Sequence, residues 1–212
     1  MLTKTDFLLY LESPMHLWAS AHNQLEIKPP SLLEQHLSSQ GQQVESLGHT
    51  YFEEVLLPHY PNAQLIWQPS YETRQFKIRV DALIFDADAK AYDLYEIKSS
   101  TSVHKRHEYD LTFQVLVLER FLNLRYAYLL HIDKTYIQRE ILEIARFFSV
   151  ENLTEKVDKH RDEITTLREQ AWIVSQMDAP QRSFACTKPR TCPCPSLCHP
   201  KLPENPIYHI PY

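Results

Sequence analysis

Glycine is nearly absent from this sequence, which contains only two, Gly41 and Gly48, in 212 residues. Phosphate-binding loops of the Walker or Rossmann type need several glycines at fixed spacing, because the backbone must approach the phosphates closely. The scarcity of glycine therefore excludes most nucleotide-binding classes. Long hydrophobic runs are missing too, since no run approaches the roughly 18 apolar residues that span a bilayer. We therefore expect no membrane partner.

A secretory signal and an excess of basic charge are also missing. Asp6 interrupts the first residues, and no small-residue cleavage site follows them, so we expect a cytoplasmic protein. The formal net charge is −5, whereas nucleic-acid-binding proteins usually show a basic surface. A basic groove and an acidic metal site would partly cancel in that sum. The net charge therefore does not exclude a nuclease.

Cysteine is scarce and unevenly placed, because all four cysteines lie between Cys186 and Cys198. Such crowding in a cytosolic protein indicates a metal or cluster site rather than a disulfide framework. The interleaved prolines rigidify this stretch and reduce the entropy lost on ordering it. Four thiolates can hold a 4Fe–4S cluster or a tetrahedral zinc ion. The C-x5-C-x-C-x3-C spacing identifies neither, and metal-free cysteines, reduced or disulfide-linked, are the third alternative.

The hydrophobic periodicity predicts a helix, several strands, a helix and a strand in that order, which indicates an α/β or α+β layer arrangement. Helices are predicted over residues 3–11, 31–57, 107–122, 139–148 and 154–177, and strands over 65–67, 72–85, 91–98 and 125–132. Residues 79–98 are predicted to form a hairpin. Beyond Pro180 the composition changes to proline, cysteine and polar residues. We therefore expect a domain over residues 1–180 and a cysteine-rich segment over 181–212 packed on it.

The predicted hairpin brings two acids and a lysine together. Alternation along a strand puts Glu96 and Lys98 on one side and turns Ile97 into the core. Asp81 lies on the partner strand. Carboxylates bind Mg²⁺ or Mn²⁺, which activates a bound water, and a lysine can orient that water or stabilise the transition state of phosphodiester hydrolysis. Taken alone, the Glu-x-Lys pattern is far more typical of a surface ion pair on a hairpin than of a catalytic site.

The surroundings of these residues resemble the RecB-like branch of the PD-(D/E)xK nuclease superfamily, which includes CRISPR-associated exonucleases. The resemblance rests on Asp81, on Glu96-Ile97-Lys98 and on Gln114 in the next predicted helix. That branch carries a Gln-x3-Tyr motif, and Leu118 stands here in place of its tyrosine. The resemblance implies a restriction-endonuclease-like core, with a central mixed sheet flanked by helices. It also implies catalytic roles for Asp81, Glu96, Lys98 and Gln114.

A closer resemblance covers nearly the whole chain. The sequence is similar to the N-terminal, nuclease-like part of an uncharacterised bacterial family, whose full members are often much longer. The shared motifs are Lys4-Thr5-Asp6, the segment from Ser13 to Trp18, Glu96 to Ser100, Asp110 to Gln114, and the cysteines. In that family the segment beginning at Ser13 reads Cys-Pro-x-x-Leu-Trp. This chain therefore has serine where the family has its N-terminal cysteine.

The family also places a histidine or glutamate on its first long helix. His49 is the preferred candidate here and Glu45 the second, and their spacing of four puts both on one helix face. The resemblance implies an Mg²⁺ or Mn²⁺ site comprising His49, Glu45, Asp81, Glu96 and Ile97. For Glu45 and His49 the alternative is a solvated helix face. Lys105 and Arg106 are candidates for binding phosphates by charge, and a solvated basic loop is the alternative for them.

Iron–sulfur members of the branch hold their 4Fe–4S cluster with one N-terminal and three C-terminal cysteines. Here Ser13 occupies the N-terminal position, and Cys194 is the additional C-terminal cysteine. We therefore expect Cys194 to serve as the fourth ligand. The expected ligand set is Cys186, Cys192, Cys194 and Cys198. Zinc remains the alternative to the cluster.

These observations predict a metal-dependent nuclease that hydrolyses phosphodiester bonds of DNA. We expect an exonuclease or a single-strand-acting enzyme with a structural iron–sulfur cluster. Single-stranded DNA or DNA ends are the expected substrate, and a helicase or another repair or defence protein is a candidate partner. The alternatives are a catalytically silent nucleic-acid-binding or scaffold protein with a nuclease fold, and a metal-cluster redox sensor. The intact set of Asp81, Glu96 and Lys98 favours activity.

Overall fold

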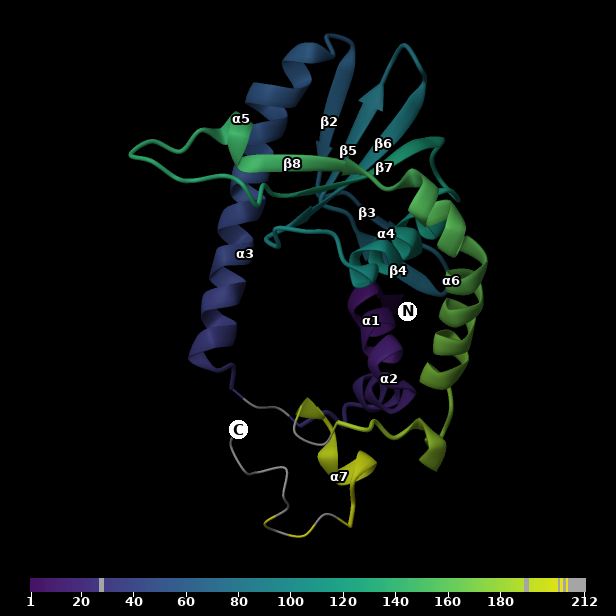
Figure 1. Cartoon of the computed structure of the whole chain (residues 1–212). Coiled ribbons are helices and arrows are strands. Elements are labelled where there is room, and N and C mark those ends of the chain that lie inside the picture. The colour runs from purple at the N-terminus through teal and green to yellow at the C-terminus, as the bar shows by residue number, and fades with distance from the viewer. Residues whose placement is uncertain (27–28, 189–190, 202, 204, 206–212) are drawn as a thin grey trace. The chain divides into compact units, whose positions relative to one another are not determined.

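The computed structural model describes residues 1–26, 29–188, 191–201, 203 and 205 (Figure 1). The chain forms two compact units. Met1–Pro29 and Thr166–Tyr212 make up the first, and Pro30–Thr165 the second. The boundary that the sequence predicts at residue 180 falls inside the first unit. None of the described helices is long and apolar enough to cross a membrane.

The second unit is built on a five-stranded mixed sheet. The strands lie in the order β2-β5-β6-β7-β8, and their bounds are Ala63–Trp67, Ala82–Asp86, Ala91–Lys98, Leu124–Ile132 and Phe148–Asn152. The pair β6 and β7 is parallel and the other neighbours are antiparallel. Parallel neighbours need a crossover, which helix α4 (Lys105–Leu118) supplies.

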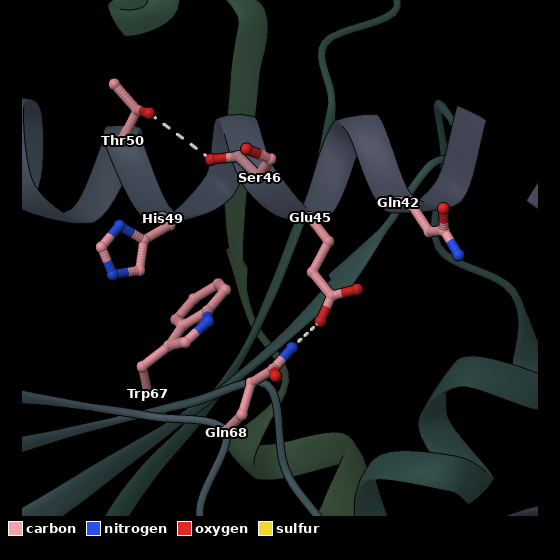
Figure 2. Close-up of a pocket in the computed structure, with 7 residues that line it drawn as sticks. All are labelled: Gln42, Glu45, Ser46, His49, Thr50, Trp67 and Gln68. Carbon is pink, nitrogen blue, oxygen red and sulfur yellow. Dashed lines mark hydrogen bonds between the residues drawn. The ribbon is translucent and has the colours of Figure 1, made fainter. Parts of the chain in front are cut away.

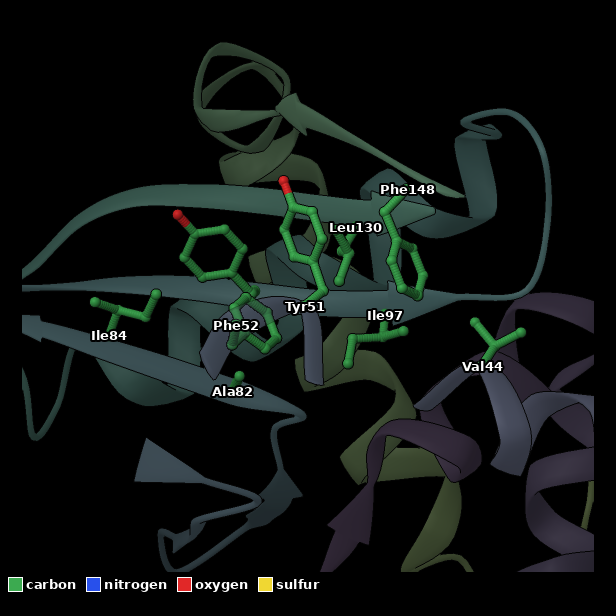
Figure 3. Packing of buried hydrophobic residues seen from close by; sticks show 9 residues of the cluster. Val44, Tyr51, Phe52, Ala82, Ile84, Ile97, Leu130 and Phe148 are labelled. Carbon is green, nitrogen blue, oxygen red and sulfur yellow. The ribbon is translucent and has the colours of Figure 1, made fainter. Parts of the chain in front are cut away.

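Helix α3 (Leu32–Tyr51) covers one face of this sheet and continues as a π-helical turn, Phe52–Leu56, and a 3-10 turn, Leu57–His59. Figure 3 shows the core between them, which comprises Val44, Tyr51, Phe52, Ala82, Ile84, Tyr95, Ile97, Leu130 and Phe148. Helix α4 covers the other face, and its residues from Tyr109 to Leu118 are all buried. The predicted mixed sheet flanked by helices is therefore confirmed.

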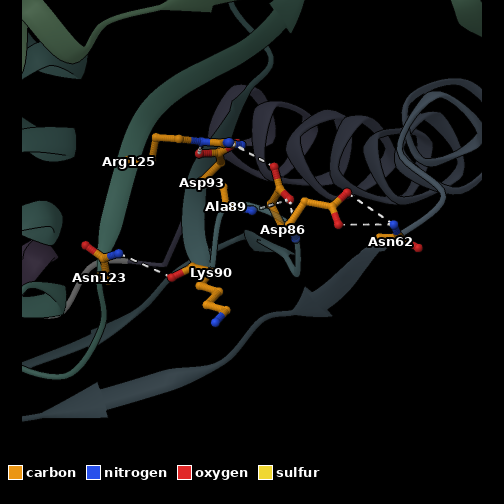
Figure 4. A network of polar contacts seen from close by, with 8 residues as sticks. Asn62, Asp86, Ala89, Lys90, Asp93, Asn123 and Arg125 are labelled. Carbon is orange, nitrogen blue, oxygen red and sulfur yellow. Dashed lines mark hydrogen bonds and ion pairs between the residues drawn. The ribbon is translucent and has the colours of Figure 1, made fainter.

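A polar network secures the turn end of the β5–β6 hairpin (Figure 4). Asp86 Oδ1 accepts hydrogen bonds from the backbone of Asp88 and Ala89 and so shapes the turn. Arg125 of β7 donates to both oxygens of Asp93, at 3.0 and 2.6 Å, and to Asp86 at 2.8 Å. One guanidinium thus connects three neighbouring strands. This bidentate geometry fixes their register at the end opposite to Lys98.

Two predictions of local structure are wrong. The helix predicted over 139–148 is replaced by a single turn, α5 (Ile144–Phe147), followed by strand β8. The end of this segment forms a strand because it pairs with β7, with Val150 opposite Leu130. The strand predicted over 72–85 is divided into β3 (Ser70–Glu72), β4 (Phe76–Arg79) and β5. Asp81 lies in the break between β4 and β5, where the chain changes direction.

The first unit combines segments from both ends of the sequence. It contains β1 (Leu2–Thr3), α1 (Lys4–Glu12), α2 (Pro14–Ala21), the 3-10 turn Arg182–Phe184 and α7 (Pro195–Cys198). Helix α6 (Thr154–Ser175) contributes its last residues. Tyr10 donates a hydrogen bond of 3.0 Å to the Gln170 side chain, and Trp18 donates one of 2.8 Å to the carbonyl of Met177. The two segments are therefore packed against each other.

The two glycines provide a matched test of this packing. A Cβ atom at Gly48 would lie 2.7 Å from Cδ1 of Ile97, whereas one at Gly41 would meet nothing within 4 Å. We expect Gly41→Ala to raise the free energy of unfolding by about 0.5–1 kcal/mol through helix propensity. Gly48→Ala should lower it by about 1 kcal/mol, because overpacking outweighs that gain.

Urea denaturation measures both changes. Ile97→Val removes the clashing methyl group, so Gly48→Ala should cost much less in that background. Equal stabilisation by Gly41→Ala and Gly48→Ala would show that α3 does not approach β6 at this point.

Candidate functional site

A buried polar network lies where β6 faces α4. Lys98 Nζ donates to Glu96 Oε1 at 2.5 Å and to Asp110 Oδ2 at 3.0 Å. Gln114 Nε2 donates to Glu96 Oε2 at 2.8 Å and to Asp110 Oδ1 at 3.1 Å. Glu96, Asp110 and Gln114 are at most 2% exposed. Buried carboxylates need this kind of pairing, and here lysine and amide fix the orientation of both acids.

The side-chain periods of a strand and of a helix together place these residues in the network. Alternation along β6 turns Glu96 and Lys98 toward α4, while Ile97 packs under α3. On α4, Asp110 and Gln114 are four residues apart and so share the face that covers β6. The network therefore follows from the strand period on one side and the helix period on the other.

Asp81 lies beside this segment. Its Oδ2 accepts a hydrogen bond of 2.7 Å from the backbone N–H of Ile97, and its side chain is partly buried. Asp81 occupies the bend between β4 and β5, and its carboxylate faces β6. The structure thus brings Asp81 to the residue that separates Glu96 from Lys98.

The carboxylates of the network keep Lys98 in its charged form. Burial alone would lower the pKa of Lys98, but the carboxylates of Glu96 and Asp110 outweigh it and hold that pKa well above its ordinary value. His107, in the first turn of α4, behaves differently. Burial and the charge of Lys98 lower the pKa of His107 to about 4, so its ring is neutral near pH 7.

The α3 side contains a hollow of about 390 Å³ (Figure 2), lined by Gln42, Glu45, Ser46, His49, Thr50, Trp67 and Gln68. The Gln68 side chain donates to the Glu45 carboxylate, and its backbone N–H donates to the Asp81 carbonyl at 3.0 Å. The His49 ring meets Trp67 edge-on at 4.6 Å between centroids, and its Nδ1 lies 3.3 Å from Glu53. Gln68 therefore connects this hollow to the bend that carries Asp81.

The structure does not gather all the predicted metal ligands at one point. Glu45 and His49 lie in the hollow, whereas Glu96 contacts α4. Within the described residues, Glu45, His49, Asp81 and Glu96 form no compact group of three or more donor atoms. Lys105 and Arg106 are exposed in the first turn of α4, and Lys105 Nζ lies 4.7 Å from the centre of the Tyr109 ring. Their roles therefore remain predictions.

Sequence reasoning left Asp110 out of the site, although its i,i+4 spacing to Gln114 was visible. That spacing is just as typical of a hydrogen-bonded pair on a helix surface. Its burial against Lys98 depends on the crossover from β6 to β7, which the spacing does not reveal. Trp67 and Gln68 gave no signal in the sequence.

A second group of donors lies in the first unit. The ligand atoms of His16, Cys186, Cys192 and Cys198 all lie within 4.8 Å of one another. Cys194 Sγ lies 3.8 Å from Cys198 Sγ, and all four cysteines are buried and free of disulfides. Burial raises the pKa of Cys192 far above its ordinary value and that of Cys194 to about 12. A His/Cys group able to bind a metal is therefore present, and it shares Cys186, Cys192 and Cys198 with the predicted ligand set.

Ser13 and His16 have different parts in this region. The Ser13 hydroxyl donates to the carbonyl of Phe184 and accepts the N–H of Met15 at 3.2 Å, so it caps α2 and holds the C-terminal segment. His16 Nε2 lies 3.6 Å from Cys192 Sγ. Only His16 joins the compact group of donors. The sequence did not predict His16 as a ligand, because no spacing relates it to cysteines near the far end of the chain.

No family model matches this sequence, and no curated protein matches it either. Among solved structures, one similar chain is SSO0001, with a TM-score of 0.48 and 17% identity, covering 95% of this chain and 87% of that chain. Another is an alkaline exonuclease (LHK-Exo) from Laribacter hongkongensis, with a TM-score of 0.45 and 10% identity, covering 81% of this chain and 89% of that chain. Similarity at this level does not determine an activity for this chain.

Proposed function

We propose that this chain is a metal-dependent nuclease that hydrolyses phosphodiester bonds of DNA. The observation that carries the proposal is the buried network of Glu96, Lys98, Asp110 and Gln114, with Asp81 on the adjacent backbone. A surface ion pair on a hairpin would be exposed, whereas Glu96 is 1% exposed. Burying several charges in one place is costly, and such clusters gather at functional sites.

The donor set suits Mg²⁺ or Mn²⁺, because these ions prefer carboxylate oxygens. Gln114 Oε1 is buried beside Glu96 and has no hydrogen-bond partner among the described residues, so the network contains one unused acceptor. The sequence resemblance assigns the metal to Asp81, Glu96 and Ile97, with His49 or Glu45 contributed by α3. Glu96 faces α4, whereas Glu45 and His49 lie in the hollow on the α3 side, so metal binding would have to draw these donors together. When bound, the metal supplies charge neutralisation at the phosphoryl oxygens and lowers the pKa of a bound water.

The remaining residues position groups and charge. Lys98 offers an ammonium that can orient the attacking water or stabilise charge on the phosphoryl group. Asp110 and Gln114 are positioning residues, since each acts by holding Lys98 or Glu96. Lys105 and Arg106 are exposed and would bind phosphates by charge.

We take single strands or ends of DNA as the substrate class, and a helicase or another repair or defence protein as a partner. The support is the sequence resemblance to RecB-like nucleases together with the exposed basic residues that open α4. Cleavage of labelled single- and double-stranded DNA and RNA, with Mg²⁺ and with Mn²⁺, tests this assignment. Cleavage of RNA alone would contradict the choice of DNA.

Single substitutions should separate direct from positioning roles. We expect Asp81→Ala, Glu96→Gln and Lys98→Ala each to reduce the cleavage rate by about 100-fold or more, because each removes a group that touches metal or phosphate. Asp110→Asn leaves the reacting groups in place, so its loss should be smaller, about 10- to 100-fold. Initial rates on single-stranded DNA with Mn²⁺ measure these effects.

The matched control is the exposed pair of Glu72 and Lys77 on the β3–β4 hairpin, whose charged atoms are 3.6 Å apart. Glu72→Gln and Lys77→Ala should leave the rate unchanged. Wild-type rates in the Asp81, Glu96 and Lys98 variants would refute the assignment. Absence of cleavage by the wild-type chain, with DNA binding retained, would replace it with a silent DNA-binding role.

Salt dependence tests how the substrate is bound. The double variant Lys105→Ala/Arg106→Ala should bind single-stranded DNA more weakly, and the slope of log affinity against log salt should fall by about one to two. Arg146→Ala is the control, since Arg146 is an exposed arginine on α5, away from α4. Fluorescence titration of the Glu96→Gln protein across salt concentrations measures both. An equal slope change in the Arg146 variant would exclude a specific basic contact at α4.

A further inference from the structure

The donors of the first unit lie too close together for the cluster that the sequence resemblance implies. Thiolates that bind different irons of a 4Fe–4S cluster stand roughly 6 Å apart, because the cluster lies between them. Here four donor atoms all lie within 4.8 Å of one another. The residues present therefore do not fit a 4Fe–4S cluster.

A single tetrahedral ion fits these separations. With Zn–S bonds of about 2.3 Å and Zn–N bonds of about 2.0 Å, neighbouring ligand atoms lie about 3.4–3.8 Å apart. His16 Nε2 is 3.6 Å from Cys192 Sγ. We propose that the first unit binds one zinc ion through His16 of α2 and through Cys186, Cys192 and Cys198. This site does not depend on the nuclease proposal, which concerns the second unit.

His16 has the surroundings of a metal ligand. It is 5% exposed, and its Nδ1 is buried without a hydrogen bond. Glu12, one turn earlier on the chain, lies 3.7 Å from that Nδ1. Histidine ligands usually present their second nitrogen to a carboxylate, which fixes the tautomer and the ring orientation. Glu12 is therefore in the place of that outer partner.

The sulfur atoms also have outer partners. The backbone N–H of Cys186 points at Cys198 Sγ at 3.4 Å, and His199 Nε2 lies 3.5 Å from Cys186 Sγ. N–H donors of this kind stabilise thiolates that bind a metal. Cys194 is the competitor of His16 for the fourth position, since its Sγ lies 3.8 Å from Cys198 Sγ. Cys194 is not among the four residues whose ligand atoms all lie within 4.8 Å of one another. We therefore assign the fourth ligand position to His16.

Four protein ligands make a closed site, which is typical of structural rather than catalytic zinc. Three ligands come from residues 186–198 and one comes from α2, so the ion would join the two chain segments that build the first unit. Its binding energy would then contribute directly to folding of that unit.

Measurements on the wild-type full chain decide the metal and its ligands. Elemental analysis of anaerobically purified protein should find one zinc per chain, with neither iron nor labile sulfide. Zinc X-ray absorption should show three sulfur neighbours at about 2.3 Å and one nitrogen at about 2.0 Å. Stoichiometric iron with sulfide would overturn the single ion. A shell of four sulfurs would overturn His16 and favour Cys194.

Variants test the same assignment by zinc affinity, measured by competition with a chromophoric chelator. His16→Ala should weaken zinc binding by more than the roughly 10- to 100-fold that loss of an outer partner costs. His16→Cys should retain zinc, and so should Cys194→Ser. His22→Ala is the matched control, since His22 is a neighbouring histidine that stacks on Trp18. If His16→Ala does not fold, the zinc X-ray absorption spectrum of the wild-type protein decides between His16 and Cys194 as the fourth ligand. Unchanged affinity in His16→Ala, or loss of zinc in Cys194→Ser, would refute the proposal.

Discussion

Burying Glu96 and Asp110 in one pocket costs free energy, because two like charges lose their hydration and repel each other. Lys98 removes most of this cost by lying between them, within 3.0 Å of both. Deleting one partner of such a group typically costs about 3–5 kcal/mol, since a buried charge is left without compensation. The contact also constrains the backbone. Glu96 and Lys98 face α4 only in one strand register, and Asp110 faces them only in one helix rotation, so a shift of either element by one residue would break the group.

The rest of the second unit holds this register from both ends of the hairpin. At the turn end, Arg125 connects β5, β6 and β7 through Asp86 and Asp93. Near Lys98, α3 lies close over Ile97, where a Cβ atom at position 48 would come within 2.7 Å of Ile97 Cδ1. The backbone N–H of Ile97 in turn holds Asp81. The polar network therefore lies on strands fixed by packing and pairing, which is the rigidity that the proposed chemistry would need.

Local periodicity was enough to predict much of this unit. The β5–β6 hairpin, the buried helix that carries Gln114 and the common side of Glu96 and Lys98 follow from residue spacing and were found. The misses depend on distant partners. Strand β8 forms because its backbone pairs with the edge of β7, whereas the residues of β8 taken alone indicated a helix. Asp110 lies beside Lys98 only because β6 and β7 are parallel and need a crossover helix. No spacing links His16 to Cys192, since they are neighbours only in the folded chain.

The contrast between Ser13 and His16 follows from helix geometry. Ser13 is the N-cap of α2, so its hydroxyl serves the backbone of that helix and the carbonyl of Phe184. A residue three positions later lies on the same side of the helix, one turn further along. His16 therefore faces the cysteines, and its Nε2 lies 3.6 Å from Cys192 Sγ. Imidazole suits zinc as well as thiolate does. In the proposed zinc site, a ligand from α2 would therefore connect the two chain segments that build the first unit.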